Sequence, residues 1–371
     1  MIPVFRPSMG DEEVQAVGDV LKSGWIGLGP KTKQFEEEFA SYIGSKYAVG
    51  VNSATAALHL ALKVMGVEGG EVITTPMTFV STSHAILYNN AVPVFCDVEP
   101  DTLNIDVDKI ESCLTVRTKA ILVVHYGGYS VDMDKVNTIA KRYNLKVIED
   151  VAHGCGGSYH NQKLGSLGDI ACFSFHAVKN LATGDGGMIT TDDPQIYGRL
   201  MKLRWLGITK DTWSREETDS KKYSWYYNVE ELGYKCHMND ITAALGIVQL
   251  RKLDDLNQRR GEISQMYSNA FQKNGNIGIP VIKPYMTEPA FHNYVIKVPY
   301  RDGLNDFLKE RGISTGVHYM PVNRYDMYSH FGNNTPCSDE IWKQLLTLPL
   351  YPDLSDDEVK YIISAVQEYI H

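Results

Sequence analysis

Short apolar runs alternate with helical patterns of apolar residues through the first half of the chain. The runs predict strands, and the periodic segments between them predict helices. Strands that alternate with helices are typical of an α/β layered domain with a mostly parallel sheet. The predicted strands are 47–51, 72–75, 92–96, 120–125, 146–149 and 171–175, and the helices between them are 55–65, 81–88 and 134–142. A further run, 188–191, is expected to pair antiparallel or to close an edge.

The alternation of short strands and helices does not continue in the second half of the chain. Residues 205–230 crowd tryptophans and tyrosines into a polar stretch without a period, which favours an ordered loop. A long helical pattern follows at about 239–273, and the remainder predicts a smaller α+β unit. Its expected elements are strands at 294–298 and 315–318 and helices at 303–311 and 356–370. We therefore expect a large domain over 1–245, then a linking helix and small C-terminal domain over 246–371.

Composition narrows the class of protein. The 371 residues leave room for two or three domains, and the net charge of −9 argues against general binding to nucleic acid or to an anionic membrane. The apolar runs are far shorter than a membrane span, and the N-terminus lacks the layout of a signal peptide. None of the six cysteines forms a CxxC pair, so no metal site is indicated. Reduced thiols in a cytoplasmic enzyme are the expected interpretation.

A lone lysine lies between an apolar run and a glycine-rich turn. The stretch Phe-Ser-Phe-His-Ala-Val-Lys-Asn covers 173–180 and places Lys179 five residues after Ser174, ahead of Gly-Asp-Gly-Gly at 184–187. This layout suits a lysine that holds pyridoxal phosphate as a Schiff base, with the serine hydroxyl on the cofactor phosphate. Taken alone, a lysine such as Lys179 is more often a solvated surface residue, but the buried strand before it and the glycines after it favour a site.

A carboxylate follows the predicted strand at 146–149. Pyridoxal chemistry needs an acidic group near the pyridine nitrogen, because a protonated ring is the stronger electron sink. Asp150 is expected to fill this role, and His153, three residues on, is expected to contact the ring hydroxyl or to stack on the ring. The alternative for Asp150 is a plain helix cap.

Two more strand ends complete the predicted cofactor site. The strand at 47–51 turns into a helix whose first amides suit a phosphate, with Thr55 and the Ala56 amide as expected contacts. Phe79, just past the strand at 72–75, is expected to stack on the pyridine face. Taken singly, the first could be an ordinary helix cap and Phe79 an ordinary core residue.

These segments, in this order, resemble the DegT/DnrJ/StrS aminotransferases over essentially the whole chain. Within the family the chain looks closest to the sugar C4 aminotransferases, such as the enzyme that forms UDP-4-amino-4-deoxy-L-arabinose. The matching pieces are Arg-Pro-Ser-Met-Gly at 6–10, Ser-Gly-Trp-Ile at 23–26, Gly-Pro-Lys at 29–31, the stretch 174–180, Gly-Tyr-Lys at 233–235, Leu-Asn-Gln-Arg-Arg at 256–260 and Leu-Pro-Leu-Tyr-Pro at 348–352. The resemblance implies a pyridoxal-phosphate transferase of fold type I, assembled as a homodimer with active sites at the subunit interface.

The resemblance also assigns roles to positions of this chain. It implies that Lys179 forms the Schiff base, that Asp150 meets the pyridine nitrogen, and that His153 stands where the family has Gln or His. By the same likeness Thr55, Ala56 and Ser174 hold the phosphate, and Phe79 stacks on the ring. His237 stands where relatives often have Asn or Arg that reach the partner's phosphate, and Asp185 stands where Glu is usual.

The substrate site is expected from the same family segments and from the small domain. Trp25, Ile26 and Gly29 match segments near the sugar, and His318 and Tyr319 follow a predicted small-domain strand. The loop at 205–227 is expected to cover the nucleotide. Each of these could instead be core or interface packing.

The resemblance implies that an amino group moves from L-glutamate to a nucleotide-linked 4-keto-6-deoxy sugar, in the biosynthesis of amino sugars for a surface polysaccharide, lipopolysaccharide or glycan. The alternatives are a C3 aminotransferase, a pyridoxal-phosphate-dependent sugar dehydratase and, in another class, a non-enzymatic regulator. Related dehydratases have histidine in place of the lysine, so Lys179 argues against that branch. The absence of a basic DNA-reading helix argues against the regulator.

Overall fold

A seven-stranded sheet forms the centre of the structure, a computed structural model that describes residues 1–209, 227–332 and 334–370. Its strand order is β1-β9-β8-β5-β4-β2-β3, and only β9 runs antiparallel to its neighbours. The strands are β1 (Tyr47–Val51), β2 (Glu71–Thr74), β3 (Val92–Phe95), β4 (Thr118–Val124), β5 (Lys146–Asp150), β8 (Ile170–Ser174) and β9 (Gly187–Thr191). The predicted large, mixed and mostly parallel sheet is confirmed.

Helices cover both faces of this sheet, which is why the central strands are apolar on both sides. One buried cluster joins the sheet to α2, α5 and α8, and a second joins it to α3, α4 and α6. The helices of this part are α1 (Asp11–Ser23), α2 (Pro30–Ile43), α3 (Ala54–Val64), α4 (Val80–Tyr88), α5 (Met133–Tyr143) and α6 (Pro194–Leu203), with 3₁₀ turns η1 (Val107–Cys113) and η2 (Tyr126–Gly128) and a small hairpin of β6 (Ser158–Tyr159) and β7 (Gln162–Lys163).

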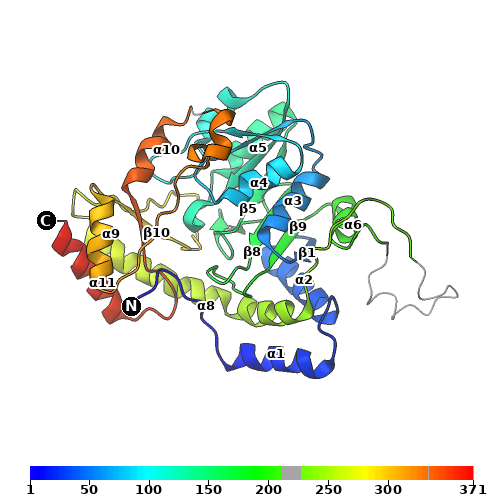
Figure 1. The fold of residues 1–371 in the computed structure, drawn as a ribbon, viewed down its shortest axis with the longest axis horizontal. Coiled ribbons are helices and arrows are strands. Elements are labelled where there is room, and N and C mark those ends of the chain that lie inside the picture. The colour runs from blue at the N-terminus through cyan, green and yellow to red at the C-terminus, as the bar shows by residue number, and fades with distance from the viewer. Residues whose placement is uncertain (210–226, 333, 371) are drawn as a thin grey trace.

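Helix α8 (Asp240–Phe271) links this layered part to the C-terminal part (Figure 1). Its first half contributes Ile247 and Leu253 to the core of the sheet, and its second half contributes Tyr267 and Phe271 to a separate cluster. That second cluster contains residues of β10 (Tyr294–Lys297), α9 (Arg301–Glu310), β11 (Leu345–Leu348) and α11 (Asp356–Tyr369). Four short elements lie between α9 and β11 in the chain: η3 (Val322–Arg324), η4 (Asp326–Phe331), α10 (Pro336–Ile341) and η5 (Trp342–Gln344). The division at residue 245 stays a prediction, since α8 spans it.

The N-terminus lies against the C-terminal part rather than the sheet. Ile2 forms a bridge with Ile313, and the Leu350 amide donates to the Val4 carbonyl. This packing brings Phe5, from the start of the chain, to the cavity described below.

Several sequence-based expectations need correction. Residues 315–318 form no strand, apart from a single bridge at Gly316, and β10 pairs instead with β11, which was not predicted. The antiparallel pairing that was one of the two expectations for 188–191 is confirmed, since β9 lies between β1 and β8 and runs antiparallel to both. Helices α1, α2 and α6 were also not predicted.

Most of the aromatic loop expected at 205–227 lies outside the described residues, because 210–226 are not described. Its predicted role over a nucleotide therefore stays a prediction. Within the described ranges, no helix has the length and apolar character that crossing a membrane requires. The same ranges contain no group of three or more His, Cys, Asp or Glu side chains arranged to hold a metal ion.

Candidate active site

A cavity of about 320 Å³ opens beyond the carboxyl ends of β5 and β8, where ligands bind in open α/β sheets. Segments from both halves of the chain line it, from Phe5 to Tyr319. It brings together eight of the residues that the sequence singled out: Thr55, Phe79, Asp150, His153, Ser174, Lys179, His318 and Tyr319.

Asp150 is the last residue of β5 and is almost fully buried, with 3% of its surface exposed. Its carboxylate accepts hydrogen bonds from the Thr82 hydroxyl at 2.8 Å and the Ala152 amide at 3.1 Å. Burial raises the pKa of Asp150, while these two hydrogen bonds and the charge of Lys179 act in the opposite direction. A buried carboxylate of this kind suits a cationic ring nitrogen, whose charge would offset the desolvation.

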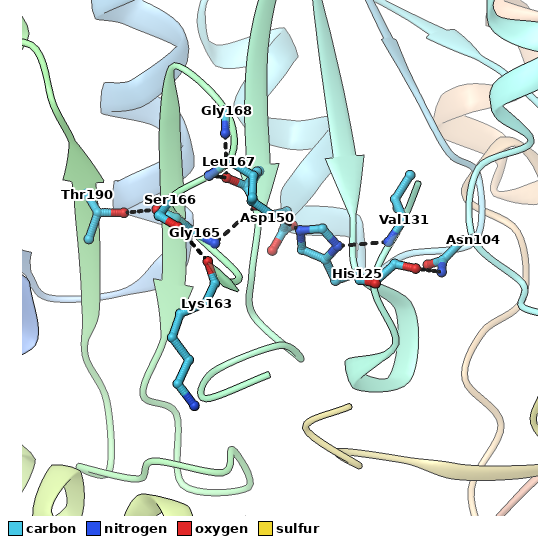
Figure 2. Close-up of polar contacts among 12 residues, drawn as sticks. Asn104, His125, Val131, Asp150, Lys163, Gly165, Ser166, Leu167, Gly168 and Thr190 are labelled. Carbon is cyan, nitrogen blue, oxygen red and sulfur yellow. Dashed lines mark hydrogen bonds and ion pairs between the residues drawn. The ribbon is translucent and has the colours of Figure 1, made fainter. Parts of the chain in front are cut away.

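A second buried carboxylate fixes the strand that carries Asp150. The amides of Gly165, Leu167 and Gly168, which are labelled in Figure 2, donate hydrogen bonds of 2.7 to 3.0 Å to the fully buried carboxylate of Glu149. Its other partner is Nε2 of His125 at 3.1 Å. Since Glu149 points away from the cavity side of β5 and is fully hydrogen-bonded, we interpret it as support for the neighbouring Asp150.

Lys179 follows β8 in a tight loop that returns to β9. The loop is closed by backbone hydrogen bonds from the Ala177 amide to the Gly184 carbonyl and from the Phe175 amide to the Gly186 carbonyl. Burial lowers the pKa of Lys179 to about 8, against the attraction of Asp150. Its Nζ atom lies 3.5 Å from Nε2 of His292. A lysine with this pKa is partly unprotonated near neutral pH, which imine formation and proton transfer both require.

The N-terminus of α3 faces the same cavity. Ser53 caps the helix, accepting a hydrogen bond from the Ala56 amide at 3.1 Å. That amide is therefore already paired, and Ala56 does not line the cavity, whereas Thr55 and Ser174 do. A Cβ on Gly187 would lie 2.7 Å from the Ser53 backbone, so glycine permits β9 to approach this turn. A helix N-terminus beside two hydroxyls suits a phosphate group.

His153 and Tyr319 form a hydrogen-bonded pair across the cavity, with Nε2 of the histidine 2.9 Å from the tyrosine hydroxyl. The Gly127 amide donates to Nδ1 of His153 at 3.2 Å, so the ring proton is on Nε2 and is donated to Tyr319. Burial lowers the pKa of His153 well below its usual value, which keeps the ring neutral. The hydroxyl hydrogen of Tyr319 is therefore free to serve a ligand. Phe79, at the rim, is 60% exposed.

Besides Ala56, four predicted residues lie away from this cavity within one chain, namely Trp25, Ile26, Gly29 and His237. Trp25 packs over Gly29, where a Cβ would lie 2.0 Å from the indole nitrogen, and Ile26 is 51% exposed. His237 pairs with Val51 at the edge of the sheet and packs against Trp205 with ring centroids 4.3 Å apart. Burial lowers the pKa of His237 to about 4.

The cavity also contains residues that the sequence analysis missed. Thr82 holds Asp150, His292 faces Lys179, and Phe5 stacks on His292 with ring centroids 5.4 Å apart. The one available signal for His292 was its position two residues before a predicted strand. Thr82 and Phe5 carried no local signal.

The residues present fit pyridoxal phosphate. The cavity offers a buried amine with a lowered pKa, a buried carboxylate for a ring nitrogen, and a helix N-terminus with two hydroxyls for a phosphate. A site of this construction defines an enzyme that uses a lysine-bound pyridoxal cofactor.

Comparison with known proteins agrees with this class. The model of the DegT/DnrJ/EryC1/StrS aminotransferase family matches residues 7–367. The chain is 44% identical to the spore coat polysaccharide biosynthesis protein SpsC of Bacillus subtilis, over 100% of this chain and 97% of that one. The chain belongs to the DegT/DnrJ/EryC1/StrS aminotransferase family, and the resemblance seen in the sequence is confirmed.

Solved structures give the same result. A putative sugar aminotransferase of Streptococcus pneumoniae, Spr1654, superimposes with a TM-score of 0.92 at 34% identity, and each chain covers 100% of the other. That protein has been solved in forms with pyridoxal phosphate and with pyridoxamine phosphate. PseC of Helicobacter pylori, an aminotransferase involved in the biosynthesis of pseudoaminic acid, superimposes with a TM-score of 0.91 at 29% identity, over 100% of this chain and 99% of that one. Fold type I and a pyridoxal-phosphate-dependent aminotransferase are thereby confirmed.

Proposed function

We propose that this aminotransferase moves an amino group from L-glutamate to C4 of a nucleotide-linked 4-keto-6-deoxy sugar in the cytoplasm. The observation that carries the proposal is the shared cavity of Lys179 and Asp150, which extends past Phe79 and Tyr319 to the surface. Support for a sugar comes from the names of the relatives, since SpsC belongs to polysaccharide biosynthesis and Spr1654 is a putative sugar aminotransferase.

The chain's own residues have distinct tasks in this reaction. Pyridoxal phosphate, when bound, supplies the carbonyl group that accepts the amino group and the ring that withdraws electrons. Asp150 holds the proton of the ring nitrogen, and Thr82 orients its carboxylate. Lys179 Nζ takes up and returns the proton that moves during amino transfer, which its pKa of about 8 permits. Thr55 and Ser174 anchor the phosphate, and the Tyr319 hydroxyl serves as a donor to the cofactor or the sugar.

Four predicted residues, Trp25, Ile26, Gly29 and His237, lie away from the cavity of their own chain. We infer that a second copy of the chain completes the site, with these four residues facing the cavity of the partner. The exposed apolar side chains of Ile26 and Phe79 support an interface there, because such residues favour burial in assemblies.

The substrate assignment is tested with a panel of nucleotide-linked 4-keto and 3-keto sugars, each with L-glutamate as donor. We expect a 4-amino sugar product, identified by mass spectrometry and NMR of the aminated carbon. Conversion of 3-keto sugars alone would contradict the C4 assignment, and loss of a sugar hydroxyl without amination would indicate a dehydratase.

Mixing two inactive variants tests the shared site. If Lys179 of one subunit works with His237 of the other, co-folded Lys179→Ala and His237→Ala chains form hybrids with one intact site. Activity should recover to about a quarter of wild type, since half of the dimers are hybrids with one working site. The two variants refolded separately and then mixed without subunit exchange serve as the control. No recovery in proven hybrids would contradict a role for His237 across the interface.

A further inference from the structure

His292 contacts the reacting nitrogen but has no part in the mechanism above. Its Nε2 atom lies 3.5 Å from Nζ of Lys179, and the residue is 2% exposed. The ring stacks on Phe5, at 5.4 Å and 1° between ring planes, and on His153, at 4.5 Å and 30°. Two stacking partners leave the buried imidazole little freedom to turn, so the direction of its edge is fixed by the fold.

The protonation of this ring follows from its second neighbour. Asn180 donates both amide hydrogens, to the Asn257 side-chain oxygen at 2.7 Å and to the Ala290 carbonyl at 2.6 Å. Because a backbone carbonyl only accepts, the Asn180 oxygen must be the atom that faces Nδ1 of His292 at 3.0 Å. Nδ1 therefore carries the ring proton, and Nε2 presents a lone pair to Lys179.

The surroundings keep the ring uncharged. The titratable and charged groups that face it are Lys179, His153, His318 and Arg260, all of which disfavour a further positive charge. Together with burial they lower the pKa of His292 well below its usual value. His153 is also neutral, so the stacked pair adds no positive charge beside the lysine.

We propose that His292 is a positioning residue for Lys179, which accepts one N–H of the lysine amine at Nε2 and so turns the amine lone pair toward the cavity. An amine has one lone pair and two N–H bonds, so fixing one N–H restricts where the lone pair points. Contacts between catalytic groups are often long in the free enzyme, which is consistent with the 3.5 Å separation. The inference rests on the proposed role of Lys179 as the group that moves the proton, and not on the identity of the sugar.

Three substitutions separate this role from packing. His292→Asn can keep the bond to Asn180 but has no atom that reaches Lys179. His292→Gln can place an oxygen acceptor near the Nε2 position. His292→Phe keeps the stacking on Phe5 and His153 without either polar atom. The Asn and Gln variants form the matched pair, and the Phe variant reports on packing.

The first measurement uses cofactor-free protein. The pKa of Lys179 is taken from the pH dependence of its modification by an amine-directed reagent, located by mass spectrometry. A hydrogen bond accepted from the lysine favours its charged form, so the Asn and Phe variants should lower this pKa by about half a unit to one unit. The Gln variant should stay near the wild-type value of about 8.

The second measurement is the half-reaction with L-glutamate alone, followed by the absorbance of the bound cofactor, so that an error in the sugar assignment leaves it intact. At saturating donor, the rates of the Asn and Phe variants should be about 10- to 100-fold lower than that of wild type, while their KM values stay within about threefold of the wild-type value. The Gln variant should recover most of the wild-type rate. A wild-type lysine pKa and rate in the Asn variant would overturn the proposal. So would a Gln variant as impaired as the Asn variant at equal thermal stability.

Discussion

Lys179→Ala is expected to abolish amino transfer and the visible absorbance of the lysine-bound cofactor. The substitution removes both the attachment point and the base, so turnover should fall by more than about 10⁴-fold. The fold should be unaffected, because the Nζ atom makes a single 3.5 Å contact, to His292, among the hydrogen bonds described for it. Removing a buried amine with a lowered pKa also relieves desolvation, so the melting temperature of the cofactor-free variant should not fall.

The measurement combines absorbance spectra after addition of pyridoxal phosphate with an assay for the keto-acid product of L-glutamate. Lys360→Ala, on the exposed face of α11, is the matched control and should retain full activity. The assignment would be contradicted if Lys179→Ala kept a visible band and borohydride removed that band by reducing an imine between the cofactor and another lysine.

The cofactor site was predictable because its residues sit at strand ends. Asp150 and Ser174 end β5 and β8, and parallel strands with carboxyl ends at one edge bring such residues together even though they are far apart in sequence. Lys179 follows from the same logic, since the glycines after it permit the tight return to β9. Local pattern was sufficient for these residues, while their roles toward the cofactor stay predictions.

The rest of the site depends on tertiary packing that leaves no local pattern. Phe5 reaches the cavity because the N-terminal segment pairs with the C-terminal part, through the bridge of Ile2 with Ile313. The role of His292 can be inferred only from its contacts with Asn180 and Lys179, which lie more than a hundred residues earlier in the chain. For the same reason β11 was missed and 315–318 was wrongly expected to be a strand, since both segments are only four residues long and pairing with β10 is what distinguishes β11.

Asp150→Asn is expected to lower the activity and to raise the stability of the cofactor-free protein. Asparagine keeps nearly the same shape, and it can accept from the Ala152 amide with its oxygen and donate to the Thr82 hydroxyl with its nitrogen, but it does not hold a proton on the ring nitrogen. Amino transfer should therefore fall by about 10²- to 10⁴-fold, with weaker cofactor binding, as expected when a charged partner of the reacting group is lost. Asp134→Asn, at an exposed carboxylate on α5, is the matched control and should behave as wild type.

The melting temperature of the cofactor-free Asp150→Asn variant should be higher than that of wild type, and the difference should depend on pH. Burial raises the pKa of Asp150, so its ionised form costs stability above that raised pKa. The cost disappears as the pH falls below the ordinary aspartate value, where the carboxyl is protonated in both folded and unfolded chains. Asp150→Asn should therefore melt higher than wild type near about pH 8, and the two curves should converge toward about pH 4. Thermal melts of both proteins without cofactor measure this difference. If the variant melted at a lower temperature than wild type at pH 8, the charge of Asp150 would stabilise the empty site. The attraction of Lys179 would then outweigh the cost of desolvating the carboxylate.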